Sequence, residues 1–143
     1  MGEHASTSPV RTSRVDVSVA AELAQLPMLR ALAETVALLT DFTLDEVSDV
    51  RLAVDEVASI LMMEALPGAV LRCELTASDT GLLVRVSTTA AGVGLPDNNS
   101  FGWHVLRTLT DSVVATQHPY DAEASGYPTI IEFSRMRSSI SGG

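Results

Sequence analysis

The order in which hydrophobic periodicities follow one another limits the fold of this chain more than any other sequence feature. Two stretches with helical spacing, residues 27–40 and 43–66, stand next to each other, and strand-like alternation precedes and follows them. Helices that alternate strictly with strands give a parallel sheet, whereas helices grouped between hairpins indicate an antiparallel sheet with one helical face. The sequence therefore predicts an α+β fold, a two-layer α/β sandwich with a mostly antiparallel sheet.

Local signals support each expected element. Valines alternate with polar residues over 15–19, as in a strand that buries one face, and Pro27 suits the first turn of a helix. Thr43 and Glu46 have the spacing of a capping box at the start of the second helix, and Asn99 or Ser100 suits the N-cap of a third. The other strands are expected at 71–75, 82–87, 113–116 and 129–133. The expected order is β-α-α-β-β-α-β-β.

Charge and composition exclude several classes of function. The 143 residues are enough for one domain, and their apolar share of 46% predicts a buried core. Eighteen acidic and nine basic residues give a net charge of −9, which disfavours direct binding of nucleic acid. All nine basic residues are arginines. P-loop, Schiff-base and kinase-type lysine chemistry are therefore excluded.

Cysteine content and the chain ends indicate a compartment. Cys73 is the only cysteine, so an intramolecular disulfide is excluded and a reducing cytosol fits. The first residues lack the apolar region of a signal peptide, and no stretch reaches the roughly 20 apolar residues of a membrane span. We therefore expect a cytoplasmic protein without a membrane segment. Residues 1–13 and 138–143 are expected to be flexible tails around a domain at 14–137.

A carboxylate on the second helix is the first candidate for chemistry. On a helical wheel, Glu56 falls on an arc with Ile60 and Met63, opposite the valine-rich core face. Apolar neighbours would partly desolvate the carboxylate, which disfavours its charged form and suits a general base. The alternative is a solvated glutamate beside a partner helix. Arg51 and Asp55 are expected to pair at i,i+4 on a third, solvated arc.

The start of the third helix is the second candidate. Residues 89–99 form a small, polar, aperiodic loop that holds Gly92, and Ser100, Gly102 and Trp103 follow it. Free backbone N–H groups at such a helix start favour a phosphate. The alternative is an ordinary N-cap with Trp103 as a packing residue. The glycines of the loop lack the full dinucleotide fingerprint and indicate only flexibility.

Two segments in this order resemble a known family. Residues 51–60, RLAVDEVASI, resemble the N box of the GHKL (Bergerat-fold) ATPases, and residues 100–113, SFGWHVLRTLTDSV, resemble their second glycine box and the helix after it. The resemblance covers roughly residues 15–133 and is to the branch of anti-sigma factors and serine kinases, most closely its mycobacterial members. It implies the Bergerat fold, the two-layer sandwich shared with HSP90 and histidine kinases.

This resemblance assigns roles to particular residues. Glu56 takes the place of the catalytic glutamate, and Arg30 the place of an arginine that contacts both the sigma factor and its competing anti-anti-sigma protein. The adenine-reading position falls on Thr88, and Gly92 lies in the first glycine box. Gly102 is the glycine kept from the second box. The resemblance also implies a homodimer.

In the family's serine kinases, ATP and Mg²⁺ bind at these boxes, and the amides of Gly102 and Trp103 would hold the phosphates. Two positions depart from the pattern: Ile60 replaces the asparagine that holds Mg²⁺, and Thr88 replaces the aspartate that accepts the adenine amino group. A hydrocarbon side chain cannot ligate magnesium. Four hypotheses stay open: an active kinase, a binding protein with a degenerate ATP site, a binder gated by ATP or ADP without phosphoryl transfer, and a structural domain of no nucleotide history.

The reading that we favour is an anti-sigma factor. It would sequester an alternative sigma factor of the stress or sporulation type and would be released by an anti-anti-sigma partner. The acidic net charge fits the capture of a basic protein face and would steer that encounter.

Overall fold

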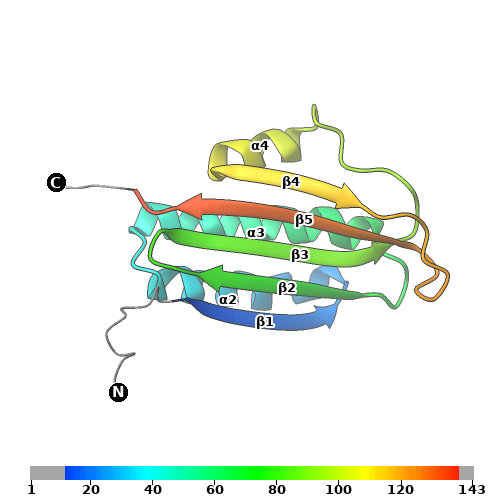
Figure 1. The fold of residues 1–143 in the computed structure, drawn as a ribbon, viewed down its shortest axis with the longest axis horizontal. Helices are drawn as coiled ribbons and strands as arrows, with labels where there is room; N and C mark the ends of the chain where they lie inside the picture. Colours follow the sequence, from blue (N-terminus) through cyan, green and yellow to red (C-terminus); the bar gives the residue numbers. More distant parts are fainter. Residues whose placement is uncertain (1–11, 139–143) are drawn as a thin grey trace, which may run out of the picture.

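The computed structural model describes residues 12–138, in which a five-stranded antiparallel sheet carries its helices on one face (Figure 1). The strands are β1 (Ser13–Ala20), β2 (Val70–Ala77), β3 (Gly81–Ala90), β4 (Ser112–Gln117) and β5 (Tyr127–Met136). The helices are the short 3-10 helix η1 (Leu23–Gln25), α2 (Leu26–Leu39), α3 (Leu44–Glu64) and α4 (Phe101–Leu109). In the sheet the order is β1-β2-β3-β5-β4, and every neighbouring pair is antiparallel. The predicted two-layer α+β sandwich is confirmed.

Helix α3 is fixed at its start by the predicted capping box. The Thr43 hydroxyl accepts a hydrogen bond from the Glu46 amide at 3.2 Å, and the Thr43 amide donates to Glu46 Oε1 at 2.8 Å. Glu46 is buried, and its other oxygen accepts from the Ser138 amide at 2.6 Å. The same carboxylate therefore caps the helix and holds the chain just after β5.

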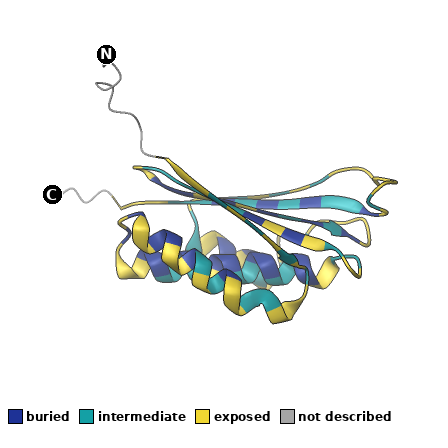
Figure 2. Ribbon diagram, turned by 90° about the horizontal axis from the view of Figure 1, so that it is seen from below, coloured by how far each residue is buried: buried dark blue, intermediate teal, exposed yellow. Residues whose placement is uncertain are grey.

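The core lies between the sheet and the helices (Figure 2). Helix α3 lies across the middle of the sheet and buries the face that the wheel predicted, with Val50, Val54 and Val57 fully inaccessible. Ala53, on the same helix, is also fully buried. Facing residues on the sheet include Leu71, Leu75, Val84 and Phe133.

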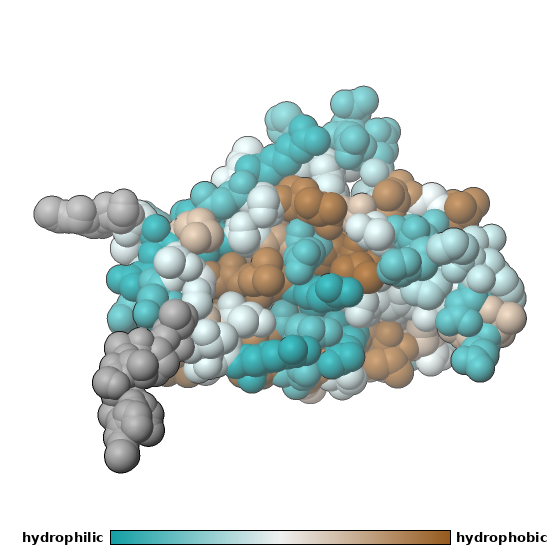
Figure 3. All heavy atoms as spheres, viewed as in Figure 1, coloured by the Kyte–Doolittle hydropathy of each residue, from teal (hydrophilic) through white to brown (hydrophobic). Residues whose placement is uncertain are grey.

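No helix of residues 12–138 lies over the outer face of the sheet. Figure 3 looks onto this face and shows polar and apolar side chains interspersed. Arg14 pairs with Glu74 at 2.8 Å and Arg72 with Asp16 at 3.1 Å, across neighbouring strands β1 and β2. All four side chains are partly solvated, so solvent screens both pairs and they contribute little to the stability of the fold.

One expected ion pair is wrong. Asp55 does not pair with Arg51 within α3; its Oδ1 lies 2.8 Å from Nε of Arg30 on α2. Both atoms are shielded from solvent and lack the alignment of a hydrogen bond, so the contact is an ion pair by distance alone. It joins the two helices because α2 and α3 pack side by side, which the wheel of α3 alone could not show.

The structure describes only part of the two expected tails. Residues 1–11 and 139–143 of the expected tails lie outside the described residues, while Ser13 begins β1. Between residues 12 and 138 no helix has both the length and the apolar character needed to cross a bilayer.

Cys73 is buried in β2, and burial, helped by nearby carboxylates, raises the pKa of its thiol to about 12. The thiol therefore stays protonated and unreactive at neutral pH.

Candidate functional site

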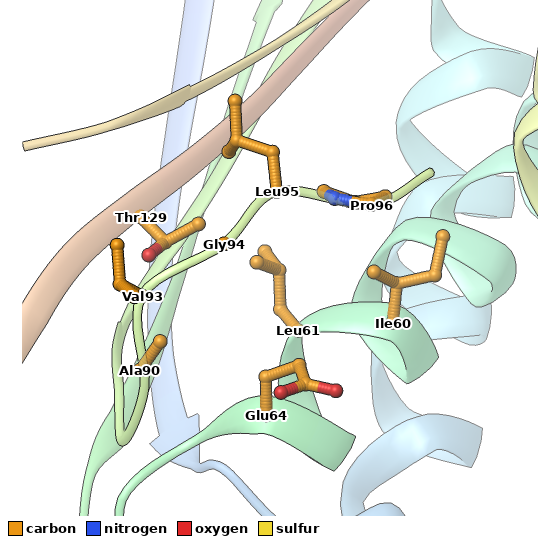
Figure 4. Close-up of a pocket in the computed structure, with 9 residues that line it drawn as sticks. All are labelled: Ile60, Leu61, Glu64, Ala90, Val93, Gly94, Leu95, Pro96 and Thr129. Atoms are coloured by element: carbon orange, nitrogen blue, oxygen red, sulfur yellow. The ribbon is translucent and has the colours of Figure 1, made fainter. Parts of the chain in front are cut away.

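A groove lies where the second half of α3 faces the loop after β3 and the start of α4. Two adjoining cavities of about 270 and 290 Å³ form it, and they share Ile60, Glu64 and Pro96. Figure 4 shows the first cavity, with Ile60 and Leu61 rising from α3 toward the segment that carries Gly94, Leu95 and Pro96. The second cavity is lined by Glu56, Ile60, Met63, Glu64, Pro96, Asp97, Ser100 and Gly102. We call the two together the α3–α4 groove.

The structure brings together two of the residues predicted from sequence, Glu56 and Gly102. A Cβ atom at position 102 would collide with Oε2 of Glu56 and lie 3.8 Å from Cδ1 of Ile60. The carboxylate of Glu56 therefore lies against the first turn of α4, where the helix dipole favours an anion. A glycine fits at 102 because the glutamate occupies the space that a side chain would need.

The start of α4 has the predicted N-cap. The Ser100 hydroxyl accepts a hydrogen bond from the Trp103 amide at 3.2 Å. This cap leaves the Trp103 amide without a free hydrogen for a phosphate. The indole of Trp103 is buried in the core, as the alternative of a packing residue predicted.

Two other predicted cofactor positions, Thr88 and Gly92, line neither cavity of the groove. Thr88 is buried in β3, and its hydroxyl donates to the Val70 carbonyl at 2.8 Å; it lines neither cavity. Gly92 is exposed in the loop after β3, and its carbonyl accepts from the side chain of Gln117 at 3.3 Å.

Gln117, at the end of β4, is a residue that sequence reasoning missed. Its Oε1 accepts from the Gly94 amide at 2.7 Å, and its Nε2 donates to the Thr129 hydroxyl at 2.8 Å as well as to Gly92. The side chain thus ties the loop after β3 to the sheet and fixes one wall of the groove. A single glutamine at the end of an expected strand carries no signal for this, because the contact depends on β4 lying at the edge beside β5.

The residues that line the groove do not fit a magnesium nucleotide. Glu56, Glu64 and Asp97 contribute three carboxylates to its lining, and no arginine or histidine of residues 12–138 lines either cavity. The phosphates would lie beside like charge, and no basic side chain of residues 12–138 lines the groove to offset it. Ile60 offers only hydrocarbon where Mg²⁺ would need oxygen. Nor do the described residues hold any group of three His, Cys, Asp or Glu side chains close enough to bind a metal ion.

Arg30, the predicted partner contact, lies on α2 and outside the groove. Its side chain is 41% exposed, and the ion pair with Asp55 holds its Nε near α3. Large apolar side chains of η1 and α2 are also exposed: Leu23, Met28, Leu38 and Leu39. We call the exposed surface of η1 and α2, over which these residues and Arg30 are distributed, the α2 face. At about 100° per residue, Met28 and Leu39 lie on the opposite side of α2 from Arg30, with Leu38 between them. Exposed apolar groups and a restrained arginine are both features of protein-binding surfaces.

Fold and site together define a class: an α+β domain with one open sheet face, an acidic groove in its helical layer and an apolar face on α2. The chain is similar to the anti-sigma-F factor RsbW of Mycobacterium tuberculosis, with 38% identity over 99 residues in both strain CDC 1551 and strain H37Rv. The match covers 69% of this chain and 59% of each relative, which is less than two thirds of the relatives' length. No protein-family model matches the chain.

Proposed function

We propose that this protein is an anti-sigma factor of the GHKL (Bergerat-fold) branch. It binds an alternative sigma factor in the cytoplasm, keeps it from RNA polymerase, and releases it to an anti-anti-sigma partner. The observation that carries the proposal is the 38% identity to an anti-sigma-F factor over 99 residues. A domain of this fold with an exposed α2 face supports it.

The α2 face is where we place the contact with the sigma factor. Leu38 and Leu39 are 52% and 82% exposed, which is more apolar surface than a solvated helix needs. Arg30 adds a cation whose position is restrained by Asp55, so less entropy is lost when it binds a carboxylate. Our proposal gives Arg30 contacts with both the sigma factor and the competing partner. It also includes a homodimer, as the family resemblance implies.

The nucleotide site is degenerate in this proposal. Support comes from Ile60, from the three carboxylates of the groove and from the capped Trp103 amide. Release then depends on the affinity of the anti-anti-sigma partner rather than on phosphorylation.

The second candidate function is a serine kinase that phosphorylates the anti-anti-sigma factor. One observation favours it: the Glu56 carboxylate lies beside Gly102 at the start of α4, as the family's catalytic glutamate would lie beside its second glycine box. We rank it below the binding function because it requires a metal ligand that Ile60 cannot supply.

Transcription in vitro tests the proposed function. Adding the chain to a reconstituted polymerase should stop transcription from promoters read by the alternative sigma factor and leave housekeeping promoters unaffected. An anti-anti-sigma protein added afterwards should restore it. Equal inhibition at both promoter classes, or none at either, would reject the role.

A further inference from the structure

Exposed apolar side chains surround the α3–α4 groove. Met63 of α3 is 74% exposed, Val93 and Leu95 of the loop are 79% and 47% exposed, and Phe101 at the start of α4 is 83% exposed. Three of them line the cavities, and Phe101 lies between two lining residues, Ser100 and Gly102. An apolar patch around a recess marks a binding surface rather than ordinary solvated structure.

Three carboxylates, of Glu56, Glu64 and Asp97, lie among these apolar side chains in the groove lining. Neither Glu56 nor Glu64 has an ion-pair partner among residues 12–138. The side chain of Asp97 accepts one local hydrogen bond, from the Asn99 amide at 2.9 Å. The groove therefore presents negative charge without a counter-charge from the described part of the chain.

From this combination we propose that the α3–α4 groove binds a cationic, amphipathic helical segment of a partner protein. Apolar side chains of the segment would contact Met63, Leu95 and Phe101, and its basic side chains would pair with Glu56 and Glu64. Between these glutamates α3 rises by about 12 Å, so a helix of a little over two turns, about 2.2, reaches from one to the other.

Charge separates this occupant from the alternatives. A nucleotide brings several negative charges to three carboxylates, and a second copy of this chain brings a net charge of −9. A basic segment supplies the missing counter-charge. The groove lies apart from Arg30 and the α2 face, so this proposal can fail while the anti-sigma role stands, and the reverse also holds.

A synthetic peptide of about 14 residues, with leucines on one helical face and lysines on the other, provides the probe. Its binding to the full chain is measured by fluorescence anisotropy, beside a matched peptide with glutamate in place of lysine. Glu64→Gln and Met63→Ala test the groove. Glu123→Gln and Leu44→Ala make the same chemical changes at exposed positions outside it.

We expect the lysine peptide to bind and the glutamate peptide not to bind. Each groove variant should weaken binding by at least about fivefold, and each control by less than about twofold, because only groove residues contact the peptide. The proposal would be overturned if the lysine peptide did not bind, or if groove and control variants lost the same affinity. Displacement of the peptide by micromolar ATP would instead assign the groove to a nucleotide. A dimer that Met63→Ala dissociates in sedimentation would assign it to a second copy of the chain. Circular dichroism checks that each variant folds.

Discussion

At the level of single residues, Glu56 and Ile60 lie one helical turn apart on α3 and favour different functions. Glu56 lies against Gly102, where the family resemblance implies a general base, while Ile60 offers only hydrocarbon where that resemblance implies a metal ligand. Phosphoryl transfer depends chiefly on positioning and on metal stabilisation of charge, so a base without a metal ligand contributes little.

Replacing Ile60 tests whether that position decides nucleotide binding. We expect the native chain to bind ATP weakly and with little dependence on Mg²⁺ in calorimetry. Ile60→Asn should strengthen binding in the presence of Mg²⁺ by about tenfold, the effect of ~1.4 kcal/mol, because the amide oxygen can approach the metal. Ile60→Leu keeps the hydrocarbon and is the control. Tight native binding that EDTA abolishes would show that another residue holds the metal and that the site is not degenerate.

Glu46 makes stability depend on pH. Burial raises the pKa of this carboxyl, but hydrogen bonds from Thr43 and Ser138 outweigh burial, so the pKa lies below its ordinary 4.5. Folding therefore favours the charged form of Glu46. Its contribution to the free energy of unfolding is complete above pH 4.5 and is lost as the pH falls through the lower pKa of the folded state. Urea unfolding should show Glu46→Ala about 1–2 kcal/mol less stable than the native chain at pH 7.

The control for this prediction is Glu46→Gln, which keeps a side-chain oxygen but does not titrate. The difference in unfolding free energy between the native chain and Glu46→Gln should shrink as the pH drops below 4.5. A difference that is constant from pH 7 to pH 3 would mean that the charge of Glu46 does not stabilise the fold.

At the level of elements, the turn between β2 and β3 leaves no room for a side chain at Gly81. A Cβ there would lie 2.7 Å from Cα of Met136 and would also collide with the Arg135 carbonyl, both on the β5 backbone. Gly81→Ala should therefore destabilise the protein by about 2–4 kcal/mol in thermal or urea unfolding. Gly92 has open space around it, and Gly92→Ala should change stability by less than about 0.5 kcal/mol. Equal effects of the two substitutions would contradict this account of the turn.

The elements themselves could be predicted from sequence because each carries local information. Period-2 valines, the capping box of Thr43 and Glu46, and the Ser100 N-cap are all encoded within a few residues. Contacts between elements could not be predicted in this way. The Arg30–Asp55 ion pair joins residues 25 positions apart, and the hydrogen bonds of Gln117 join residues 23, 25 and 12 positions apart. These contacts depend on how helices and strands pack.

Only part of the candidate site could be predicted from sequence, again because local patterns do not show contacts between elements. The helical wheel placed Glu56 near Ile60, and the helix-start pattern placed Gly102 at an N-terminus, but only the fold shows that the two meet. Glu64, at the end of α3, lines both cavities and was not singled out, because a glutamate at a helix end has no distinctive pattern.

At the level of the whole molecule, surface and charge point to protein capture. The net charge is −9, the groove is acidic, and the α2 face carries exposed apolar side chains as well as Arg30. The two surfaces lie on different elements, so two contacts of different character are available. Binding through charge is expected to weaken with salt, whereas binding through apolar area is expected to change little.

The most direct test of the central claim is a calorimetric titration of the full chain with a purified alternative sigma factor of the stress class. We predict a complex that Arg30→Glu weakens by at least about tenfold, while Arg51→Glu, a charge reversal of an arginine on α3, changes affinity by less than about twofold. Asp55→Asn, which removes the ion pair but keeps Arg30, should retain most of the affinity. The absence of any complex, or equal losses for Arg30→Glu and Arg51→Glu, would contradict the claim.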